Sequence, residues 1–163
     1  MAEAYFDFLR QTYDDVKISR LDSAGTAHWH IGSDPDPRTM STLRSNGIVS
    51  YEHSARQIAV SDFFDFDYIL AMDRSNLAAL LKMRNKAIKR NEQLGRTLAK
   101  VRLFGEGTGG DEEVSDPYYS GARGFEECFA QVEKFAVGFA TEVFKLPDDW
   151  QAKGKKKSSP PLA

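Results

Sequence analysis

One stretch of the chain decides its fold: Phe66-Asp-Tyr-Ile-Leu-Ala-Met-Asp-Arg-Ser-Asn-Leu77. Residues 68–72 within it form a continuous apolar run, which is typical of a strand buried on both faces of a parallel sheet. Asp73 ends this run, and a helix with leucines at helical spacing opens at Ser75 or Asn76. A strand followed directly by a helix is the repeating unit of an α/β fold.

The same alternation continues on either side of this stretch. Helical spacing predicts helices over residues 1–16, 37–46 and 124–144, and short apolar runs predict strands over residues 16–22 and 101–104. Because strands alternate with helices, the sequence predicts an α/β fold with a mainly parallel sheet.

Length and composition predict one domain, with 163 residues of which 41% are apolar and 28% charged. We expect residues 1–145 to form this domain and the Lys-rich residues 146–163 to form a disordered tail. No apolar run is long enough to cross a bilayer, and the first residues lack the features of a signal peptide. The net charge of -2 gives no general reason to bind nucleic acid. With a single cysteine and no internal disulfide, these features predict a cytoplasmic protein.

Two motifs are candidates for a cofactor or a metal, and neither fits its context. Gly105-x-Gly107-x-x-Gly110 follows a strand, as a dinucleotide fingerprint does, but three carboxylates follow where a helix N-terminus should hold a pyrophosphate. We therefore interpret it as a flexible loop. His28-x-His30, with two aspartates nearby, has no recognised ligand spacing. We expect neither a cofactor nor a metal.

Two further residues are candidates for chemistry. Cys128 falls on the apolar face of the helix predicted over residues 124–144, so we interpret it as a small core residue rather than a reactive thiol. Asp116 stands in an acidic loop at the carboxyl end of a strand, just before the aromatic pair 118–119. Burial beside aromatic rings and repulsion from neighbouring carboxylates favour the protonated carboxyl that a general acid needs. An aspartate that merely opens a turn before Pro117 is the alternative.

Ten short stretches of the sequence, taken together, carry a resemblance to a known family. They are Met1-Ala-Glu-Ala-Tyr-Phe6, Asp22-Ser-Ala-Gly-Thr26, Trp29-His-Ile-Gly32, Asp34-Pro-Asp-Pro-Arg38, Gly47-Ile48, Ala55-Arg-Gln-Ile58, Phe66 to Leu77 as quoted above, Val101-Arg-Leu103, Asp116-Pro-Tyr-Tyr119 and Gly124-Phe-Glu-Glu127. In this order they resemble the low-molecular-weight protein-tyrosine phosphatases over residues 1–144. The resemblance implies a three-layer α/β sandwich with a short parallel sheet flanked by helices.

The resemblance also implies a reaction, which is the hydrolysis of a phosphate monoester through a cysteinyl-phosphate. The implied substrate is a phosphotyrosine-bearing protein or a small aryl phosphate. Seven residues take family roles: Asp116 as the general acid; Trp29, Tyr118 and Tyr119 as walls of the aromatic pocket; and Ser23, His53 and Asp73 as hydrogen-bonding supports of the phosphate loop.

The chain departs from the family pattern at the phosphate loop itself. The family's Cys-x-x-x-x-x-Arg-Ser-Pro loop and the central strand leading into it would directly precede Met1, and Cys128 is no substitute because Lys134 stands six residues on. We therefore expect the first, central strand to be missing and the chain to be an N-terminally shortened phosphatase, inactive for want of a nucleophile and a phosphate-binding arginine.

Two alternatives stay open. One is a genuine, catalytically inactive phosphatase-like protein that binds or regulates partners. The other is an arsenate reductase on the same scaffold, which a single cysteine disfavours because that chemistry passes electrons between several thiols. The oligomeric state is open in every case.

Overall fold

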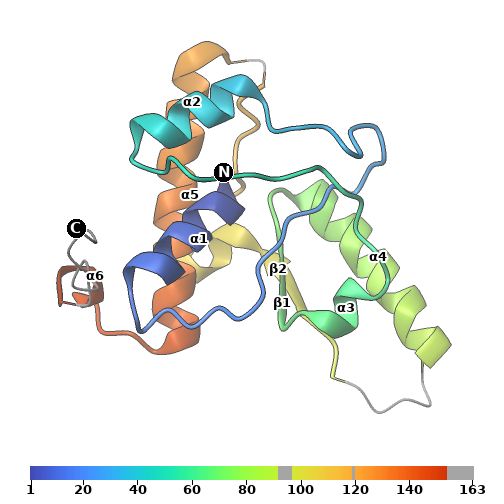
Figure 1. Cartoon of the computed structure of the whole chain (residues 1–163). Coiled ribbons are helices and arrows are strands. Elements are labelled where there is room, and N and C mark those ends of the chain that lie inside the picture. Colours follow the sequence, from blue (N-terminus) through green and yellow to red (C-terminus); the bar gives the residue numbers. More distant parts are fainter. Residues whose placement is uncertain (92–96, 119, 154–163) are drawn as a thin grey trace, which may run out of the picture.

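The computed structural model of the chain describes residues 1–91, 97–118 and 120–153 (Figure 1). Its elements are, in order, α1 (Ala2–Thr12), α2 (Pro37–Ser45), α3 (Asp62–Asp65), β1 (Tyr68–Ala71), α4 (Arg74–Asn91), β2 (Lys100–Leu103), the 3-10 helix η1 (Phe104–Thr108), α5 (Gly121–Phe144) and α6 (Trp150–Lys153). Within these ranges, no helix combines the length and the apolar character that a membrane span needs.

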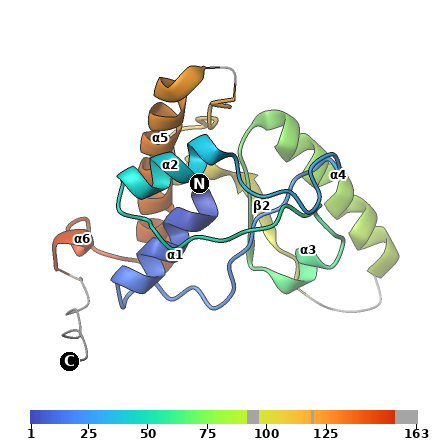
Figure 2. The same ribbon diagram turned by 45° about the horizontal axis from the view of Figure 1, so that its top comes forward.

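A small parallel sheet lies at the centre of the molecule. β1 and β2 pair in parallel, with Tyr68 opposite Lys100 at the start of the register. Side chains alternate across the sheet: Leu70 packs against the core built by α1 and α5, whereas Ile69 and Ala71 pack against a smaller core that includes α4. Helices therefore cover both faces of the strand pair, as Figures 1 and 2 show. The predicted class, α/β with a short parallel sheet flanked by helices, is confirmed.

The larger core lies between α1, η1 and α5 and is dominated by aromatic rings. Phe6 of α1 lies with its ring centroid 5.6 Å from that of Phe104 and 5.5 Å from that of Phe139. Phe135 of α5 meets Phe104 edge-on at 5.7 Å and has no exposed surface. Rings of this size dominate the burial of apolar surface in a small domain, so these contacts fix α1 on α5.

Aspartate caps begin two of the helices, and both lie next to the candidate site. The carboxylate of Asp36 accepts the backbone N–H of Arg38 at 2.8 Å and caps α2 as the sequence predicts. Asp73 accepts the backbone N–H of Asn76 at 2.6 Å. Because this bond caps the helix from Asp73, α4 begins at Arg74, slightly earlier than the sequence predicts.

The strand predicted over residues 16–22 is wrong for the part of the chain that the structure describes. The segment carries no strand assignment, and nearby Gly25 forms an isolated bridge to Gln57. A β-branched run becomes a strand only beside a pairing partner. Residues 17–24 and β1 instead both line one cavity of about 780 Å³.

The glycine motif over residues 105–110, interpreted from sequence as a flexible loop, starts in η1 and packs closely. A Cβ atom at Gly107 would lie 3.1 Å from the backbone nitrogen of Phe139 in α5, and one at Gly105 would lie 2.3 Å from the carbonyl oxygen of Glu112. These glycines are therefore required by close approach of the backbone rather than by a bound nucleotide.

Replacing Gly105 by alanine is expected to lower the free energy of unfolding by about 1–3 kcal/mol, because the added methyl overlaps the Glu112 carbonyl. Gly110→Ala is the matched control, since a Cβ there has its nearest neighbours at 3.8 Å. Urea unfolding of both variants measures the difference. Equal stability of the two variants would contradict the packed turn.

The tail predicted as disordered from residue 146 begins later in the structure. Trp150 of α6 is only 3% exposed. Its ring meets that of Tyr13 at 4.7 Å, and its indole N–H donates to the hydroxyl oxygen of Thr141 at 2.9 Å. The expectation is thus corrected for residues 146–153, while residues 154–163 lie outside the described part of the chain.

Candidate active site

A hydrogen-bonded cluster surrounds the first turn of α1. The Glu3 carboxylate accepts the Ser23 hydroxyl at 2.5 Å and lies 3.2 Å from Nδ1 of His53. The Ser23 oxygen is also 3.3 Å from Nε2 of His53. Burial, followed by the charge of Glu3, raises the pKa of Tyr51, whose ring stacks on His53 at 6.3 Å. The structure therefore brings Ser23 and His53 together as predicted, and it adds Glu3, which the sequence does not single out.

Part of this cluster has the spacing of a metal site. Among the described residues, Glu3, Asp22 and His53 offer ligand atoms that all lie within 4.8 Å of one another. The Asp22 carboxylate, however, already accepts two hydrogen bonds, one from Nε of Arg56 and one from the backbone N–H of Ser23, both at 2.8 Å. Because protein partners already engage each of the three, we interpret the group as a hydrogen-bonded support.

Asp73, the third predicted support, is engaged elsewhere. Its two carboxylate oxygens bond to Asn76, to the backbone N–H at 2.6 Å and to Nδ2 at 3.2 Å. Its carboxylate therefore fixes the start of α4, rather than joining Ser23 and His53.

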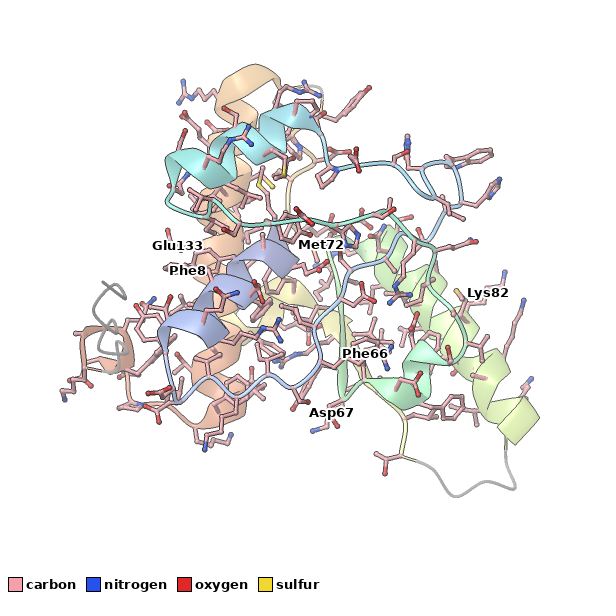
Figure 3. The ribbon with its side chains drawn as sticks, in the orientation of Figure 1. Phe8, Phe66, Asp67, Met72, Lys82 and Glu133 are labelled. Atoms are coloured by element: carbon pink, nitrogen blue, oxygen red, sulfur yellow. The ribbon has the colours of Figure 1, made fainter. Side chains whose placement is uncertain are left out.

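The loop between η1 and α5 carries Asp116 at the carboxyl end of β1. The backbone N–H of Val114 donates to the carbonyl oxygen of Met72 at 2.8 Å and ties this loop to the strand end (Figure 3). The Asp116 carboxylate accepts the backbone N–H of Tyr118 at 3.0 Å through Oδ1, which leaves Oδ2 outside that bond. The burial expected for Asp116 is wrong, because the residue is exposed. Its aromatic neighbour Tyr118 is itself 58% exposed.

Cys128 is buried on α5 with 6% of its surface exposed, which confirms its interpretation as a core residue. Burial raises the pKa of its thiol, the ammonium of Met1 lowers it, and the carboxylate of Asp116 raises it. Asp116 and the Met1 ammonium are thus both within electrostatic range of the Cys128 thiol. Because its pKa is raised, the thiol is held in its protonated, poorly nucleophilic form.

Two of the three predicted wall residues can be placed, and both are open to solvent. Trp29 is 75% exposed and stacks on His28 with ring centroids 4.2 Å apart. Its loop is closed by the backbone N–H of Gly32, which donates to the carbonyl oxygen of Ala55 at 2.7 Å. Tyr118 lies on the loop of Asp116. Tyr119 lies outside the described residues.

Arg38 joins the start of α2 to the Asp116 loop. Its Nε and Nη2 bond to the Asp36 carboxylate at 3.0 and 2.7 Å, and these bonds hold the pKa of Asp36 at about 2. Its Nη1 donates to the carbonyl oxygen of Tyr118 at 3.3 Å. The sequence does not predict this role, although the run Asp34-Pro-Asp-Pro-Arg38 signals a rigid turn at that position.

Comparisons with known proteins agree on one family. The model of the family described as "Low molecular weight phosphotyrosine protein phosphatase" matches residues 1–147. The chain is 39% identical over 146 residues to the low molecular weight phosphotyrosine protein phosphatase of Schizosaccharomyces pombe, covering 88% of this chain and 87% of that protein. It is 36% identical over 147 residues to the protein of the same name from Sus scrofa, with 88% and 86% covered.

Solved structures show the same likeness. The chain superposes on DARP, a Drosophila arginine phosphatase, with a TM-score of 0.74 and 31% identity, covering 91% of this chain and 90% of that one. It superposes on Primo-1 with a TM-score of 0.70 and 33% identity, covering 87% and 88% of the two chains.

Proposed function

The chain belongs to the low molecular weight phosphotyrosine protein phosphatase family. We therefore propose that it carries the part of an active site that binds and protonates the leaving group when phosphotyrosine or a small aryl phosphate is hydrolysed. One observation carries this proposal: the loop of Asp116 is tied to the carboxyl end of β1 by the bond from the Val114 N–H to the Met72 carbonyl oxygen. Asp116 is the general acid. Its Oδ1 accepts the Tyr118 N–H, so Oδ2 carries the proton that is donated.

The remaining residues hold the substrate and the phosphate loop. Trp29 and Tyr118 form a wall on which the aromatic ring of the substrate stacks. Ser23 and His53, with Glu3, support the backbone around the phosphate, whereas the Asp73 carboxylate serves the site by fixing the start of α4. The names of the relatives, phosphotyrosine protein phosphatases, support the substrate class.

The chemistry needs a thiolate that Cys128 does not supply. In the reaction implied by family membership, a cysteine thiolate attacks phosphorus and the bond to the phenol oxygen breaks, while Asp116 protonates that oxygen. Water then attacks phosphorus, the Asp116 carboxylate takes its proton, and the sulfur–phosphorus bond breaks to release phosphate. Cys128 is buried, burial raises its pKa, and Lys134 rather than an arginine stands six residues on. We therefore propose that residues 1–163 alone do not catalyse the reaction.

The cavity beside β1 has room for the strand that would lead to the nucleophile. It is lined by residues 69–72 on one side, by residues 17–24 on another and by Phe6 of α1. Within the described residues β1 pairs only with β2, so its outer edge can accept a further strand. We propose that a parallel strand fills this cavity as the central strand of a three-layer sandwich, and that a Cys-x-x-x-x-x-Arg loop leads from it to α1.

The start of α1 is consistent with such a loop. The helix has no side-chain cap at its N-terminus, so its first N–H groups have no side-chain acceptor. A phosphate group placed there would receive these N–H groups and the positive end of the helix dipole.

The test is an extended protein, in which an apolar strand of about five residues and a Cys-x-x-x-x-x-Arg-Ser-Pro loop precede Met1. We expect the extended protein to release phosphate from a phosphotyrosine peptide and from 4-nitrophenyl phosphate. Its Cys→Ser form and residues 1–163 alone should be inactive. A phosphoarginine peptide is assayed in parallel, because the similar DARP is an arginine phosphatase. A folded but inert extended protein, or an active 163-residue chain, would refute the proposal.

A second candidate is a phosphatase-like protein that binds partners without catalysis. The exposure of Trp29 and Tyr118, at 75% and 58%, favours it because exposed rings on loops can contact a partner. It predicts a cooperative melting transition for the 163-residue chain and no gain of activity on extension. An arsenate reductase has less support, since these residues hold one cysteine.

A further inference from the structure

We propose that Arg38 is the positioning residue of the general acid, coupling the start of α2 to the loop that carries Asp116. This inference deepens the proposed function and rests on it, because it concerns the same site. Two hydrogen bonds in series connect the two side chains: Nη1 of Arg38 donates to the carbonyl oxygen of Tyr118, and the N–H of Tyr118 donates to Oδ1 of Asp116.

The guanidinium of Arg38 is held at its other edge. Nε and Nη2 form a fork on the Asp36 carboxylate at 3.0 and 2.7 Å, and Asp36 also accepts the backbone N–H of Arg38 at 2.8 Å. The arginine is thus clamped to the helix cap from which it projects. Because two of its nitrogens are hydrogen-bonded to one carboxylate, the planar guanidinium is held in one orientation. In that orientation Nη1 is directed toward Tyr118.

Two aromatic rings lie close to the same guanidinium. The central carbon of the Arg38 guanidinium lies 4.5 Å from the ring centroid of Phe125 and 5.2 Å from that of Tyr118. Phe125 is buried at the start of α5, whereas Tyr118 belongs to the Asp116 loop. Arg38 therefore bridges α2, α5 and the acid loop, three elements that meet near the start of α1 in Figures 1 and 2.

This arrangement has a consequence for proton transfer. Asp116 is exposed, so burial does not hold its carboxyl in place, and its orientation depends on the position of Tyr118. A general acid must lie within hydrogen-bond reach of the leaving oxygen. Loosening Tyr118 should therefore slow reactions that need the proton more than reactions that do not.

The test compares Arg38→Ala and Arg38→Lys in the extended protein, on two substrates that differ in leaving group. We expect kcat/KM for phenyl phosphate, whose phenolate needs the proton, to fall about tenfold in both variants, because this constant covers only the steps up to departure of the leaving group. For 4-nitrophenyl phosphate, whose leaving group is stable without a proton, kcat/KM should fall less than about twofold. Arg123→Ala is the matched control, because Arg123 is an exposed arginine at the start of α5 that pairs with Glu127.

A double variant shows whether the effect passes through Asp116. In an Asp116→Asn background, Arg38→Ala should cause no further fall in kcat/KM, since residues acting as one unit are not additive. An equal loss on both substrates with a raised KM would overturn the proposal and show that Arg38 binds the substrate. Unchanged rates, or a full additional loss in the double variant, would also overturn it.

Hydrogen exchange on the 163-residue chain separates this inference from the proposed function. Arg38→Ala should speed amide exchange over residues 114–118 about tenfold and leave the amides of α5 unchanged, because only the loop loses its tether. If the extended protein is inert and this change is still seen, the proposed function fails while the tether stands. If exchange in the loop does not change, the tether itself is refuted.

Discussion

Replacing Asp116 by asparagine in the extended protein is expected to lower kcat/KM for phenyl phosphate by about 100- to 10,000-fold. The substitution keeps an oxygen to accept the Tyr118 N–H, so the turn at residues 116–118 is retained. It removes the carboxyl proton, and kcat/KM reports the step that uses this proton rather than the later hydrolysis of the cysteinyl-phosphate, in which the carboxylate is the base. The loss should therefore be large where the departing phenolate needs that proton and small for 4-nitrophenyl phosphate.

Asp111→Asn is the matched control, because Asp111 is an exposed aspartate of the same loop that meets Arg74 through its backbone oxygen. It should leave kcat/KM for both substrates nearly unchanged. If the control and Asp116→Asn behave alike, the general acid is another group.

Local signals along the chain suffice for most of the elements. The apolar run at residues 68–72 predicts β1, leucines at helical spacing predict α4, and the capping Asp36 predicts α2 because a cap acts on N–H groups only two or three residues away. The run at residues 16–22 has the same kind of local signal and forms no strand. Pairing depends on a neighbour that the local sequence does not specify.

The site residues divide in the same way, into those with a local sequence signal and those placed by contacts between distant segments. Asp116 stands out because its sequence neighbourhood is acidic and aromatic, whereas Trp29 and Tyr118 take their predicted roles from the family resemblance. Arg38 does not, since its contact with Tyr118 spans 80 residues and arises from how α2 sits on α5. Contact between distant segments likewise explains the burial of Trp150. The sequence predicts it as part of a disordered tail, but in the structure it is buried against Tyr13.

The largest loss of stability is expected for Phe135→Ala. Phe135 has no exposed surface and meets Phe104 edge-on, and Phe104 in turn contacts Phe6 of α1. Deleting a fully buried ring leaves a cavity that close-packed neighbours fill only in part, which costs about 3–5 kcal/mol. Since small domains are stable by only about 5–15 kcal/mol, the variant should lose a large share of its stability.

Two variants make this prediction specific to the core between α1, η1 and α5. Phe135→Leu keeps most of the volume and should cost less than about 1.5 kcal/mol. Phe8→Ala removes the same ring from a half-buried position on α1 and should cost roughly half as much as Phe135→Ala, in proportion to the apolar area lost. Urea unfolding followed by circular dichroism measures all three. Equal losses at positions 8 and 135 would contradict the full burial of Phe135 against Phe104 in this core.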